Sequence, residues 1–452
     1  MSEAKIPEGY KQTEIGVIPN DWEVTCLNEV ASFGGGTTPP RKLYERYYVR
    51  GTHCWVKTLD LNNSFIWNTE EHLTELAFSE VSLKRHPVGT VLVAMYGGFN
   101  QIGRTGLLKV EAAMNQALVA VIPKKEKLVA EYLLFNLNFN VNYWKEVASS
   151  SRKDPNITSN DVKKFLLAIP FKQEQTAIAT ALSDVDNLIQ SLEKLLAKKE
   201  AIKTGTMQQL LTGKTRLPDF ATREDGSAKG FKQTELGRIP EDWEVVRIID
   251  NHIIATGNTP PTNDQRNYKG NFLFVSPADL GASKLIYNTE KKLSLKGFKL
   301  ARKFPKGSTL FTCIGSTIGK TGLATCELTS NQQINAVFPN ERDDFEFTYY
   351  ALTHHSKRIK NKASEQAVPL INKTEFGQFE YMQPNELEEQ TAIATILSDM
   401  DAEIQALQER LKKTRDIKQG MMQQLLTGKV RLVHPSNSQN NHLSADKSEL
   451  LV

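Results

Sequence analysis

The strongest constraint on the fold is an internal duplication, in which a unit of roughly 215 residues is used twice. Three stretches show it most clearly, because each returns almost letter for letter in the second half of the chain. They are GYKQTEIGVIPNDWEV at 9–24 and GFKQTELGRIPEDWEV at 230–245, EQTAIATALSDVD at 174–186 and EQTAIATILSDMD at 389–401, and MQQLLTGKTRL at 207–217 and MQQLLTGKVRL at 422–432. A repeat of this length predicts two similar domains and not a solenoid of small repeats.

Each copy has two parts that differ in hydrophobic pattern. The first part contains short apolar runs broken by Gly, Pro and Asn, such as GTVLVAMYGG and ALVAVIP in copy one and STLFTCIG and INAVFP in copy two. These runs predict strands and turns with a few helices between them, so we expect an α+β module in each copy. The predicted boundaries are an N-terminal segment with module one over 1–170, a helix over 171–214, a linker with module two over 215–385, a helix over 386–432, and a polar, disordered tail over 433–452.

The second part of each copy is typical of one long helix. Apolar residues recur there in alternating steps of four and three, which is the heptad seam of a coiled coil. The seam residues are Leu182, Val185, Ile189, Leu192 and Leu196 in copy one and Leu397, Met400, Ile404, Leu407 and Leu411 in copy two. Each helix would be about 57 Å long at 1.5 Å per residue. Because the second helix must run back along the first, we expect an antiparallel coiled coil and a pseudo-twofold, circular arrangement of the modules. The alternative is an amphipathic helix that packs only on its own module.

Glycines mark both helices at matching positions. Gly213 and Gly428 follow the last leucines and are typical stop signals. Gly205 and Gly420 lie inside the predicted helices, where a glycine costs about 1 kcal/mol relative to alanine. Their repetition suggests that another backbone passes close to each glycine, or that regular helix ends earlier.

Composition narrows the class of protein without indicating a function. The 452 residues are 40% hydrophobic and 24% charged, as in ordinary globular proteins. The net charge of +4 is compatible with a nucleic-acid partner but does not by itself indicate one. No apolar run reaches the roughly 20 residues that span a bilayer, and the first residues lack a signal-peptide core, so we expect a cytoplasmic protein. The cysteines form no CxxC pair and have no histidine at ligand spacing, so we expect neither a metal site nor a disulfide. They are Cys26, Cys54, Cys313 and Cys326.

The stretch CIGSTIGKTGL at 313–323 is similar to a phosphate-binding loop. Such a loop needs four residues between its first glycine and the GK[ST] triplet, with a strand before it and a helix after it. Only three residues separate Gly315 from Gly319, and the residues that follow are typical of a turn into a strand. We therefore expect no nucleotide here. Instead, a glycine turn would present Lys320, and Arg104 in copy one, either to a phosphate group or simply to solvent.

Both copies carry the same ordered set of short motifs. Each opens near IPxDWEV, contains GxTPP, IG[KR]TG and NQ elements, and ends in EQTAIATxLSDxD, a helix and QQLLTGKxRL. In this order the motifs resemble the specificity subunit of type I restriction–modification systems. The resemblance covers the chain up to about Leu432.

This resemblance implies a DNA-binding subunit that has no catalytic activity of its own. Each module would be a target recognition domain that reads one half of a bipartite, asymmetric site in duplex DNA. The helices would dock two methyltransferase subunits, which carry S-adenosylmethionine, and motor-nuclease subunits would add cleavage that depends on ATP and Mg. The chain itself would hold no cofactor, and its sequence contains neither a [DN]PP[YF] methylation motif nor a complete Walker loop.

Three other functions fit parts of the pattern. The same architecture would serve as the specificity subunit of a type IIB-like restriction system. A two-headed DNA binder that acts alone, such as a repressor, would also use two similar modules. A P-loop NTPase fits only the GKT triplet, whose surroundings argue against it.

The duplication separates residues that read DNA from residues that build the scaffold. Positions that are identical in both modules cannot distinguish two half-sites, so specificity should lie where exposed polar loops diverge. Arg pairs well with guanine and Asn or Gln with adenine, which makes Arg41, Arg46, Asn100, Gln101, Asn263, Gln265, Arg266 and Asn267 the candidates for base readout. The candidates for phosphate contacts are Lys57, Arg104, Arg152, Lys153, Lys269 and Lys320.

Overall fold

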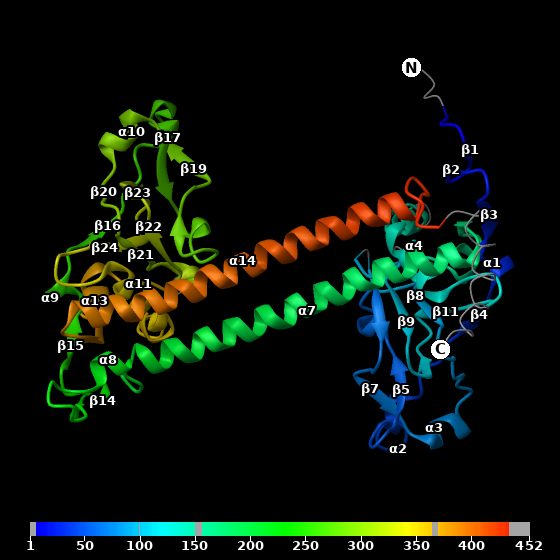
Figure 1. Ribbon diagram of the computed structural model, residues 1–452, viewed down its shortest axis with the longest axis horizontal. Coiled ribbons are helices and arrows are strands. Elements are labelled where there is room, and N and C mark those ends of the chain that lie inside the picture. Colours follow the sequence, from blue (N-terminus) through cyan, green and yellow to red (C-terminus); the bar gives the residue numbers. More distant parts are fainter. Residues whose placement is uncertain (1–5, 99, 150–155, 364–368, 434–452) are drawn as a thin grey trace, which may run out of the picture. The chain divides into compact units, whose positions relative to one another are not determined.

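The computed structural model describes residues 6–98, 100–149, 156–363 and 369–433. The chain divides into two compact units, one formed by Met1–Leu192 with Leu411–Val452 and the other by Glu193–Arg410. Two long helices, α7 (Lys172–Leu210) and α14 (Leu387–Leu425), each contribute one part to either unit (Figure 1). Each unit therefore holds one module, the start of its own helix and the end of the other helix.

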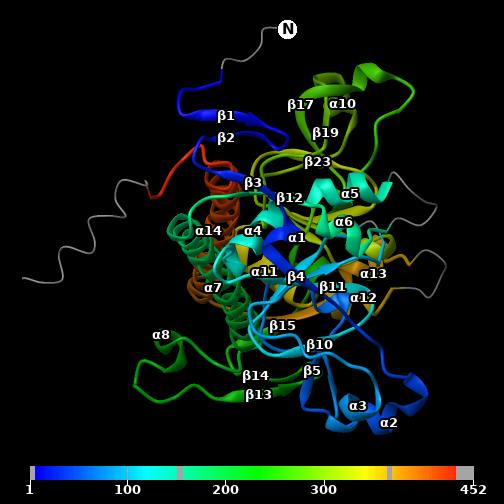
Figure 2. The ribbon, with the colours of Figure 1, turned by 90° about the vertical axis from the view of Figure 1, so that its right-hand side faces the viewer.

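The first module is built on a five-stranded sheet with the strand order β4-β11-β8-β9-β6, of which β4 and β11 are labelled in Figure 2. These strands are β4 (Ala31–Gly35), β11 (Leu118–Pro123), β8 (Val91–Ala94), β9 (Thr105–Leu108) and β6 (Ser64–Ile66). All neighbours pair antiparallel except β6 and β9, which are parallel. Every residue of β8 and β9 is buried, because helix α4 (Ala130–Phe139) packs against one face of these strands and a second apolar cluster, which includes Val56 and Met114, covers the other face. These apolar runs are therefore central strands, as their sequence predicts.

A second, smaller sheet completes the first module and carries the polar loops. Its order is β10-β5-β7, with β10 (Ala112–Met114), β5 (His53–Val56) and β7 (Glu71–Leu73). Two short helices, α2 (Tyr44–Tyr47) and α3 (Glu75–Glu80), cover it around buried Trp55. Helix α3 starts after Thr74, whose hydroxyl accepts a hydrogen bond from the Ala77 amide, a standard N-cap.

The second module repeats this topology and adds one strand, β20, to the edge of its smaller sheet. Its larger sheet has the order β16-β24-β21-β22-β18, with β16 (Ile254–Thr256), β24 (Ile334–Val337), β21 (Thr309–Thr312), β22 (Thr321–Ala324) and β18 (Leu285–Ile286). The smaller sheet has the order β19-β17-β23-β20, with β19 (Lys291–Leu293), β17 (Tyr268–Val275), β23 (Leu328–Ser330) and β20 (Lys303–Phe304). The prediction of two similar α+β modules, each followed by a long helix, is confirmed.

Short elements connect the sheets to the helices. In the first unit these are β1 (Tyr10–Thr13), β2 (Gly16–Pro19), β3 (Glu23–Cys26), β12 (Leu166–Ile169), α1 (Leu27–Val30), α5 (Val141–Ser149), α6 (Ser159–Lys163), η1 (Arg41–Leu43) and η2 (Thr58–Asp60). In the second unit they are β13 (Phe231–Thr234), β14 (Gly237–Pro240), β15 (Trp243–Arg247), β25 (Glu380–Pro384), α8 (Pro218–Ala221), α9 (Ile248–Asn251), α10 (Leu295–Leu300), α11 (Phe345–His354), α12 (Ser356–Lys360), α13 (Lys373–Gly377), η3 (Gln265–Asn267), η4 (Pro277–Asp279) and η5 (Gly315–Thr317). Among the described residues, none of the helices has the length and apolarity that a membrane span requires.

In the first unit, the start of α7 packs antiparallel against the end of α14. Ile178 and Leu182 share one hydrophobic core with Leu425 and Leu426. Farther along the pair, Lys418 forms an ion pair with Asp186 at 2.6 Å. As residue numbers rise along α7 they fall along α14, which is the antiparallel register.

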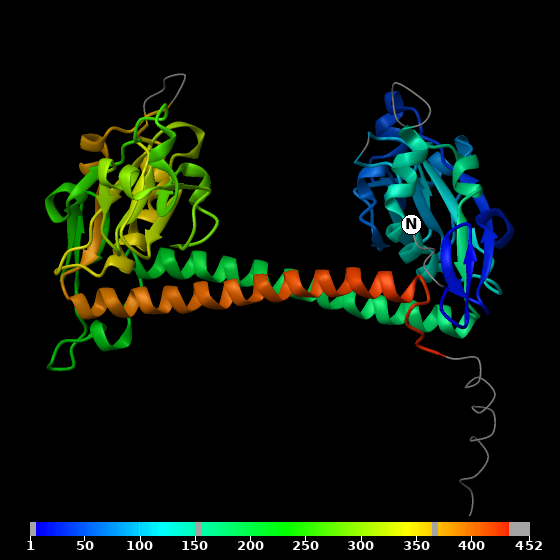
Figure 3. The same ribbon diagram turned by 90° about the horizontal axis from the view of Figure 1, so that it is seen from above.

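In the second unit, the end of α7 packs in the same way against the start of α14 (Figure 3). Met207 and Leu210 share a core with Ile393 and Leu397, and Lys199 forms an ion pair with Glu403 at 2.6 Å. The ten predicted seam residues are all buried or half-buried. The antiparallel pairing is thus confirmed within each unit, and the alternative that each helix packs only on its own module is wrong.

An arginine after each long helix fastens that helix to the start of a module. In the second unit, Arg216 bonds Glu389 at 2.7 Å and Asp242 at 2.8 Å. In the first unit, Arg431 bonds Glu174 at 2.7 Å and Asp21 at 2.8 Å. Residues 9–24 therefore take the place beside α14 that 230–245 take beside α7, as the duplication predicts (Figure 2).

The charges around Arg216 are strongly coupled. Burial alone would raise the pKa of Asp242, but hydrogen bonds from Arg216 and Lys229 outweigh it and lower the pKa to about 2. Burial raises the pKa of Glu389, whose carboxylate also accepts a bond from the Trp243 indole. Among these groups, Asp242 therefore stays ionised to the lowest pH.

The helix glycines correct one sequence-based expectation. Gly213 and Gly428 have φ of +64° and +68° and end the helices, as predicted. Gly205 and Gly420, however, lie inside regular helix, and apart from the neighbouring backbone of the same helix no described atom would lie within 4 Å of a Cβ added at either position. No neighbouring backbone requires these two glycines, and the helix does not end at them.

Candidate functional site

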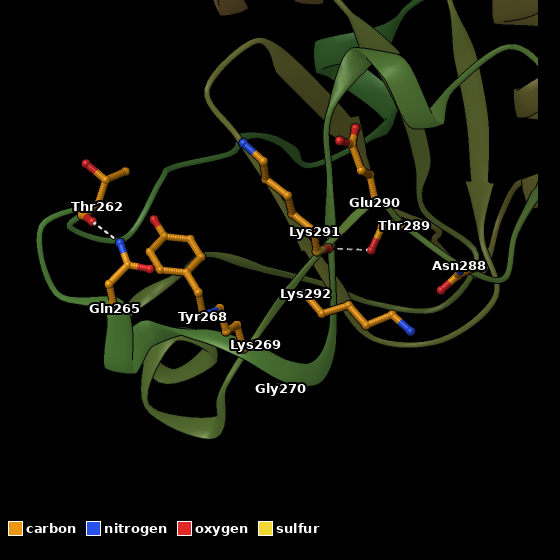
Figure 4. Close-up of a pocket in the computed structure, with 10 residues that line it drawn as sticks. All are labelled: Thr262, Gln265, Tyr268, Lys269, Gly270, Asn288, Thr289, Glu290, Lys291 and Lys292. Carbon is orange, nitrogen blue, oxygen red and sulfur yellow. Dashed lines mark hydrogen bonds between the residues drawn. The ribbon is translucent and has the colours of Figure 1, made fainter.

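A groove of about 680 Å³ lies in the second module beside the diverging polar loop 262–270 (Figure 4). One side is formed by this loop and the start of β17, and the other by β19 and the three residues before it. The lining residues are Thr262, Gln265, Tyr268, Lys269, Gly270, Asn288, Thr289, Glu290, Lys291 and Lys292. Two of the predicted DNA-contact residues, Gln265 and Lys269, therefore lie in the same groove.

The 262–270 loop is held by the two prolines that precede it. The Tyr268 hydroxyl donates to the Pro260 carbonyl at 2.7 Å, and the Asn267 amide donates to the Pro261 carbonyl at 3.1 Å. Asn267 is only 1% exposed, which corrects its assignment as a base reader. The side-chain nitrogen of Asn267 thus has its partner inside the loop, while among the described residues its buried Oδ1 atom has no hydrogen-bond partner. Asn267 therefore builds the loop and does not reach a ligand.

Positive charge dominates the groove. Lys269, Lys291 and Lys292 line it, against one carboxylate, Glu290. Lys269 has a φ of +62°, a left-handed conformation that is uncommon for a residue with a side chain. A cluster of lysines in a concave surface attracts polyanions such as a phosphate backbone.

The tip of the same loop carries the other candidates. Asn263 and Gln265 are exposed, and the Gln265 amide donates to the Thr262 carbonyl at 3.1 Å. Arg266 is well exposed but bonds Asp264 through two nitrogens, at 2.8 and 3.0 Å. Hydrogen bonds from Arg266 and Lys296 lower the pKa of Asp264. The guanidinium is thus oriented before any ligand arrives.

The equivalent loop of the first module, residues 41–50, has a different set of charges. The Arg41 guanidinium lies 4.5 Å from the centre of the Tyr48 ring and forms an ion pair with Glu71 at 2.8 Å, which raises the pKa of Arg41. Lys57 also bonds Glu71, at 3.2 Å, and Glu70 at 2.8 Å. The position of Lys291 in the groove of the second module is taken by Glu71 in the first module. The two cations of the first module, Arg41 and Lys57, are therefore already paired with this carboxylate. Lys57 is therefore less available to phosphate than Lys269.

Arg46 is held in the same manner. It forms a two-pronged ion pair with Glu80, with one N···O distance of 2.8 Å, and the Tyr47 hydroxyl donates to the same carboxylate. The bonds to Glu80 raise the pKa of Arg46 and lower that of Glu80. About half of the Arg46 side chain remains exposed.

The glycine turns lead into strands in both modules. In the second, η5 is followed by Gly319 (φ +95°) and then by β22, not by a helix, which excludes a phosphate-binding loop. Lys320 is half-buried, with its Nζ atom 3.4 Å from the Pro277 carbonyl oxygen. Arg104 is likewise half-exposed just before β9, close in sequence to exposed Asn100 and half-buried Gln101. The other two predicted cations, Arg152 and Lys153, lie outside the described residues.

The shared GxTPP and NQ motifs prove to be scaffold. A Cβ added at Gly36 would lie 2.2 Å from the Asn115 carbonyl oxygen, and one added at Gly257 would lie 2.2 Å from that of Asn331. Glycine is needed at both positions because the two chain segments run so close together. The glutamine after each asparagine then accepts a hydrogen bond from the threonine of GxTPP, at 2.7 Å in the second module.

Sequence reasoning missed several residues of this surface. Lys291 and Lys292 escaped because they are part of a strand, not of a diverging loop. Trp67 and Tyr287 escaped because an aromatic residue next to an apolar run is usually assigned to the core, whereas they are 68% and 73% exposed. The signal was present in the repeat, since both lie in Ile-aromatic-Asn-Thr-Glu at equivalent positions, 66–70 and 286–290. Within the described ranges, no group of three or more His, Cys, Asp or Glu side chains is arranged to hold a metal.

Comparison with known proteins agrees on one family. The family model described as "Type I restriction modification DNA specificity domain" matches twice, at residues 19–203 and 240–414. The putative type I restriction enzyme MjaX specificity subunit of Methanocaldococcus jannaschii is 26% identical over 437 residues, which cover 94% of this chain and 97% of that protein. The HindI specificity subunit of Haemophilus influenzae is 26% identical over 308 residues, covering 56% of this chain and 67% of the other.

Solved structures share the fold. The type I restriction–modification S subunit from M. genitalium aligns with a TM-score of 0.59 at 14% sequence identity, over 93% of this chain and 98% of that one. A chain from a structure of a type I restriction–modification complex, described in terms of assembly and conformational transition, aligns with a TM-score of 0.52 at 18% identity, over 91% and 99%.

Proposed function

The chain belongs to the type I restriction modification DNA specificity family, and on that premise we propose that it reads a bipartite, asymmetric site in duplex DNA with one half-site per module. The single observation that carries the proposal is the contrast between the two modules. One backbone topology is used twice, but the side chains next to the polar loop differ in kind, with Arg41 and Glu71 in one module and Thr262 and Lys291 in the other. Two modules with one scaffold and different surfaces suit two unlike half-sites.

Base readout is assigned to the oriented side chains of the diverging loops. Arg41 and Arg46 in module one, and Arg266 in module two, are held by carboxylates while a large part of each side chain stays exposed. An arginine fixed in this way loses little freedom when it bonds guanine, and exposed Asn263 and Gln265 supply the groups that suit adenine. Asn100 and Gln101 have the same role in module one. Phosphate contacts are assigned to Lys269, Lys320 and Arg104.

The long helices are proposed to dock two methyltransferase subunits. Several exposed residues on α7 and α14 are identical at equivalent positions, although the core packing does not require them: Thr180 and Thr395, Asp184 and Asp399, Gln208 and Gln423, and Gln209 and Gln424. Two equal surfaces suit two copies of one partner. In this proposal the chain is not catalytic. S-adenosylmethionine, ATP and Mg belong to the methyltransferase and motor-nuclease subunits.

A module exchange tests the proposal. Residues 20–170 are replaced by the equivalent module of another specificity subunit, and the complex with the methyltransferase is expressed in a host whose methylome is then sequenced. We expect one half of the methylated site to change and the other half to remain. The matched control replaces 241–384, which should change the other half. A change in both halves after either exchange would contradict readout by separate modules.

A further inference from the structure

Two exposed aromatic side chains occupy the same position in the two modules. All five tryptophans lie in the described ranges; Trp22, Trp55, Trp144 and Trp243 are at most 1% exposed, whereas Trp67 is 68% exposed. Its equivalent in the second module is Tyr287, which is 73% exposed. Each follows the edge strand of the larger sheet, β6 or β18. A large aromatic group held in water in both copies is not explained by packing in either module.

The loops that carry these side chains are rigid and are built from the same bonds. In module one, the Thr69 hydroxyl donates to the Glu71 carbonyl at 2.7 Å, and the Glu70 amide donates to the Asp60 carboxylate at 3.2 Å. In module two, the corresponding bonds are Thr289 to Lys291 at 2.6 Å and Glu290 to Asp279 at 2.8 Å. Each aromatic group therefore projects from a fixed loop whose geometry is the same in both modules.

The same loops border the surface assigned to DNA. Asn288, the residue after Tyr287, lines the groove with Lys269, Lys291 and Lys292 (Figure 4). In module one, Glu70 of the equivalent loop bonds Lys57, and Glu71 bonds Arg41 of the polar loop. A flat apolar group beside clustered lysines matches a polyanion that also offers flat apolar surfaces, which is the chemistry of nucleic acid.

We propose that Trp67 and Tyr287 are base-stacking side chains, one in each module, that insert against the bases of each half-site. This inference rests on the proposed function and adds a contact to it. Stacking on an aromatic ring tolerates any base, because every base has a π face, and inserted side chains partly unstack a base step. A contact of this kind is expected at a position that is aromatic in both modules, since it does not distinguish the half-sites.

The test uses the complex of the full chain with its methyltransferase subunits. Trp67→Ala and Tyr287→Ala are compared with Trp67→Phe and Tyr287→Phe, and Ile253→Ala serves as the control because Ile253 is equally exposed, at 70%, and lies outside the groove lining. We expect each alanine variant to bind DNA about 5- to 150-fold more weakly. The loss should be equal for a matched site and for a site with the adjacent half-site bases changed. The phenylalanine variants should retain most of the affinity, and Ile253→Ala should bind like the wild type.

A second readout does not depend on affinity. The difference in acrylamide quenching between the wild-type and Trp67→Phe complexes reports on Trp67, because the two share every other tryptophan. DNA should protect this component in the wild type. If the wild type binds its site while the alanine variants bind equally well and Trp67 stays accessible, the inference is overturned and the proposed function stands. If the variants fail to assemble with methyltransferase but bind DNA normally once assembled, the aromatic groups contact protein, which also overturns it. A wild-type complex without affinity for any site would refute both.

Discussion

Replacement of Arg431 by alanine should weaken the first unit selectively. Arg431 is 13% exposed and bonds Glu174, which is fully buried, as well as Asp21, which is 37% exposed. Its guanidinium also lies 5.8 Å from the centre of the Trp22 ring. This arginine is thus the main charged contact between the segment after α14 and the start of module one.

The expected cost follows from how deeply each partner is buried. Removing one member of a buried ion pair costs about 3–5 kcal/mol, because the remaining charge has lost both its partner and its water. In the variant, the indole of Trp22, at 3.2 Å, would be the one side-chain donor left to Glu174 within the described part of the chain. The half-exposed Asp21 adds about 0–1 kcal/mol, since water replaces the arginine there. We therefore expect a loss of about 3–5 kcal/mol in the first unit and almost none in the second.

Local amide hydrogen exchange measures this loss unit by unit, which a single unfolding temperature does not. Exchange should accelerate in β1–β3 and in the last turns of α14 but not in β13–β15. Arg216→Ala is the matched control, because its bonds to Glu389 and Asp242 repeat the geometry in the second unit. The double variant Arg431→Met with Glu174→Gln should recover most of the stability, since no buried charge is left alone. A cost below about 1 kcal/mol for Arg431→Ala would refute the reasoning.

Three further predictions concern stability and affinity. Gly205→Ala and Gly420→Ala should each stabilise the chain by about 1 kcal/mol in denaturant unfolding, because alanine favours helix and no described atom obstructs the added Cβ; a destabilised variant would show that these glycines are needed for packing. Burial, with the charges of His354 and Arg358, lowers the pKa of His355 to about 3. The folded state therefore binds a proton less readily than the unfolded state, and stability that is complete above pH 6.5 is lost as the pH falls, by about 2 kcal/mol at pH 5; His355→Phe should reduce that loss, and an unchanged profile from pH 7 to 5 would contradict it. Lys269→Ala should weaken DNA binding equally for matched and altered sites and reduce the dependence of affinity on salt concentration by about one counterion. Lys57→Ala should have a smaller effect, because Lys57 is already paired with Glu70 and Glu71. An equal effect of both variants would show that the ion pairs of Lys57 open when DNA binds.

The duplication made most of the fold predictable. Because the two copies carry one hydrophobic pattern, they must bury the same faces, and the heptad seam needs a partner of similar length. The antiparallel register then follows from chain direction alone. What the repeat could not supply was the pairing of individual charges. The sequence predicts Arg41 and Asn267 to be exposed polar loop residues. In the structure, the Arg41 guanidinium stacks on the Tyr48 ring, and the Asn267 side chain is buried against Pro261.

The prediction that another backbone passes close to Gly205 and Gly420 was wrong. A glycine repeated in both copies does not show whether a close contact inside the fold requires it. The mid-helix positions have open space around them, whereas Gly36 and Gly257 contact a carbonyl group. From the sequence, the two kinds of glycine look the same, and only packing separates them.

Burial and exposure, and not residue identity alone, therefore separate the roles of corresponding positions in the two modules. A residue that is shared and buried, such as Tyr48 with its bond to Pro39, builds the scaffold. A position that is shared and exposed, such as Trp67 and Tyr287, does not pack in the scaffold. We assign such a position to contacts that both modules make with the same kind of ligand. A residue that differs and reaches the surface, as half-buried Glu71 differs from exposed Lys291, changes the charge beside one polar loop relative to the other. Only the last class can make two modules of one fold prefer different half-sites, and for that reason exchange of Glu71 or Lys291 should alter one half-site at a time.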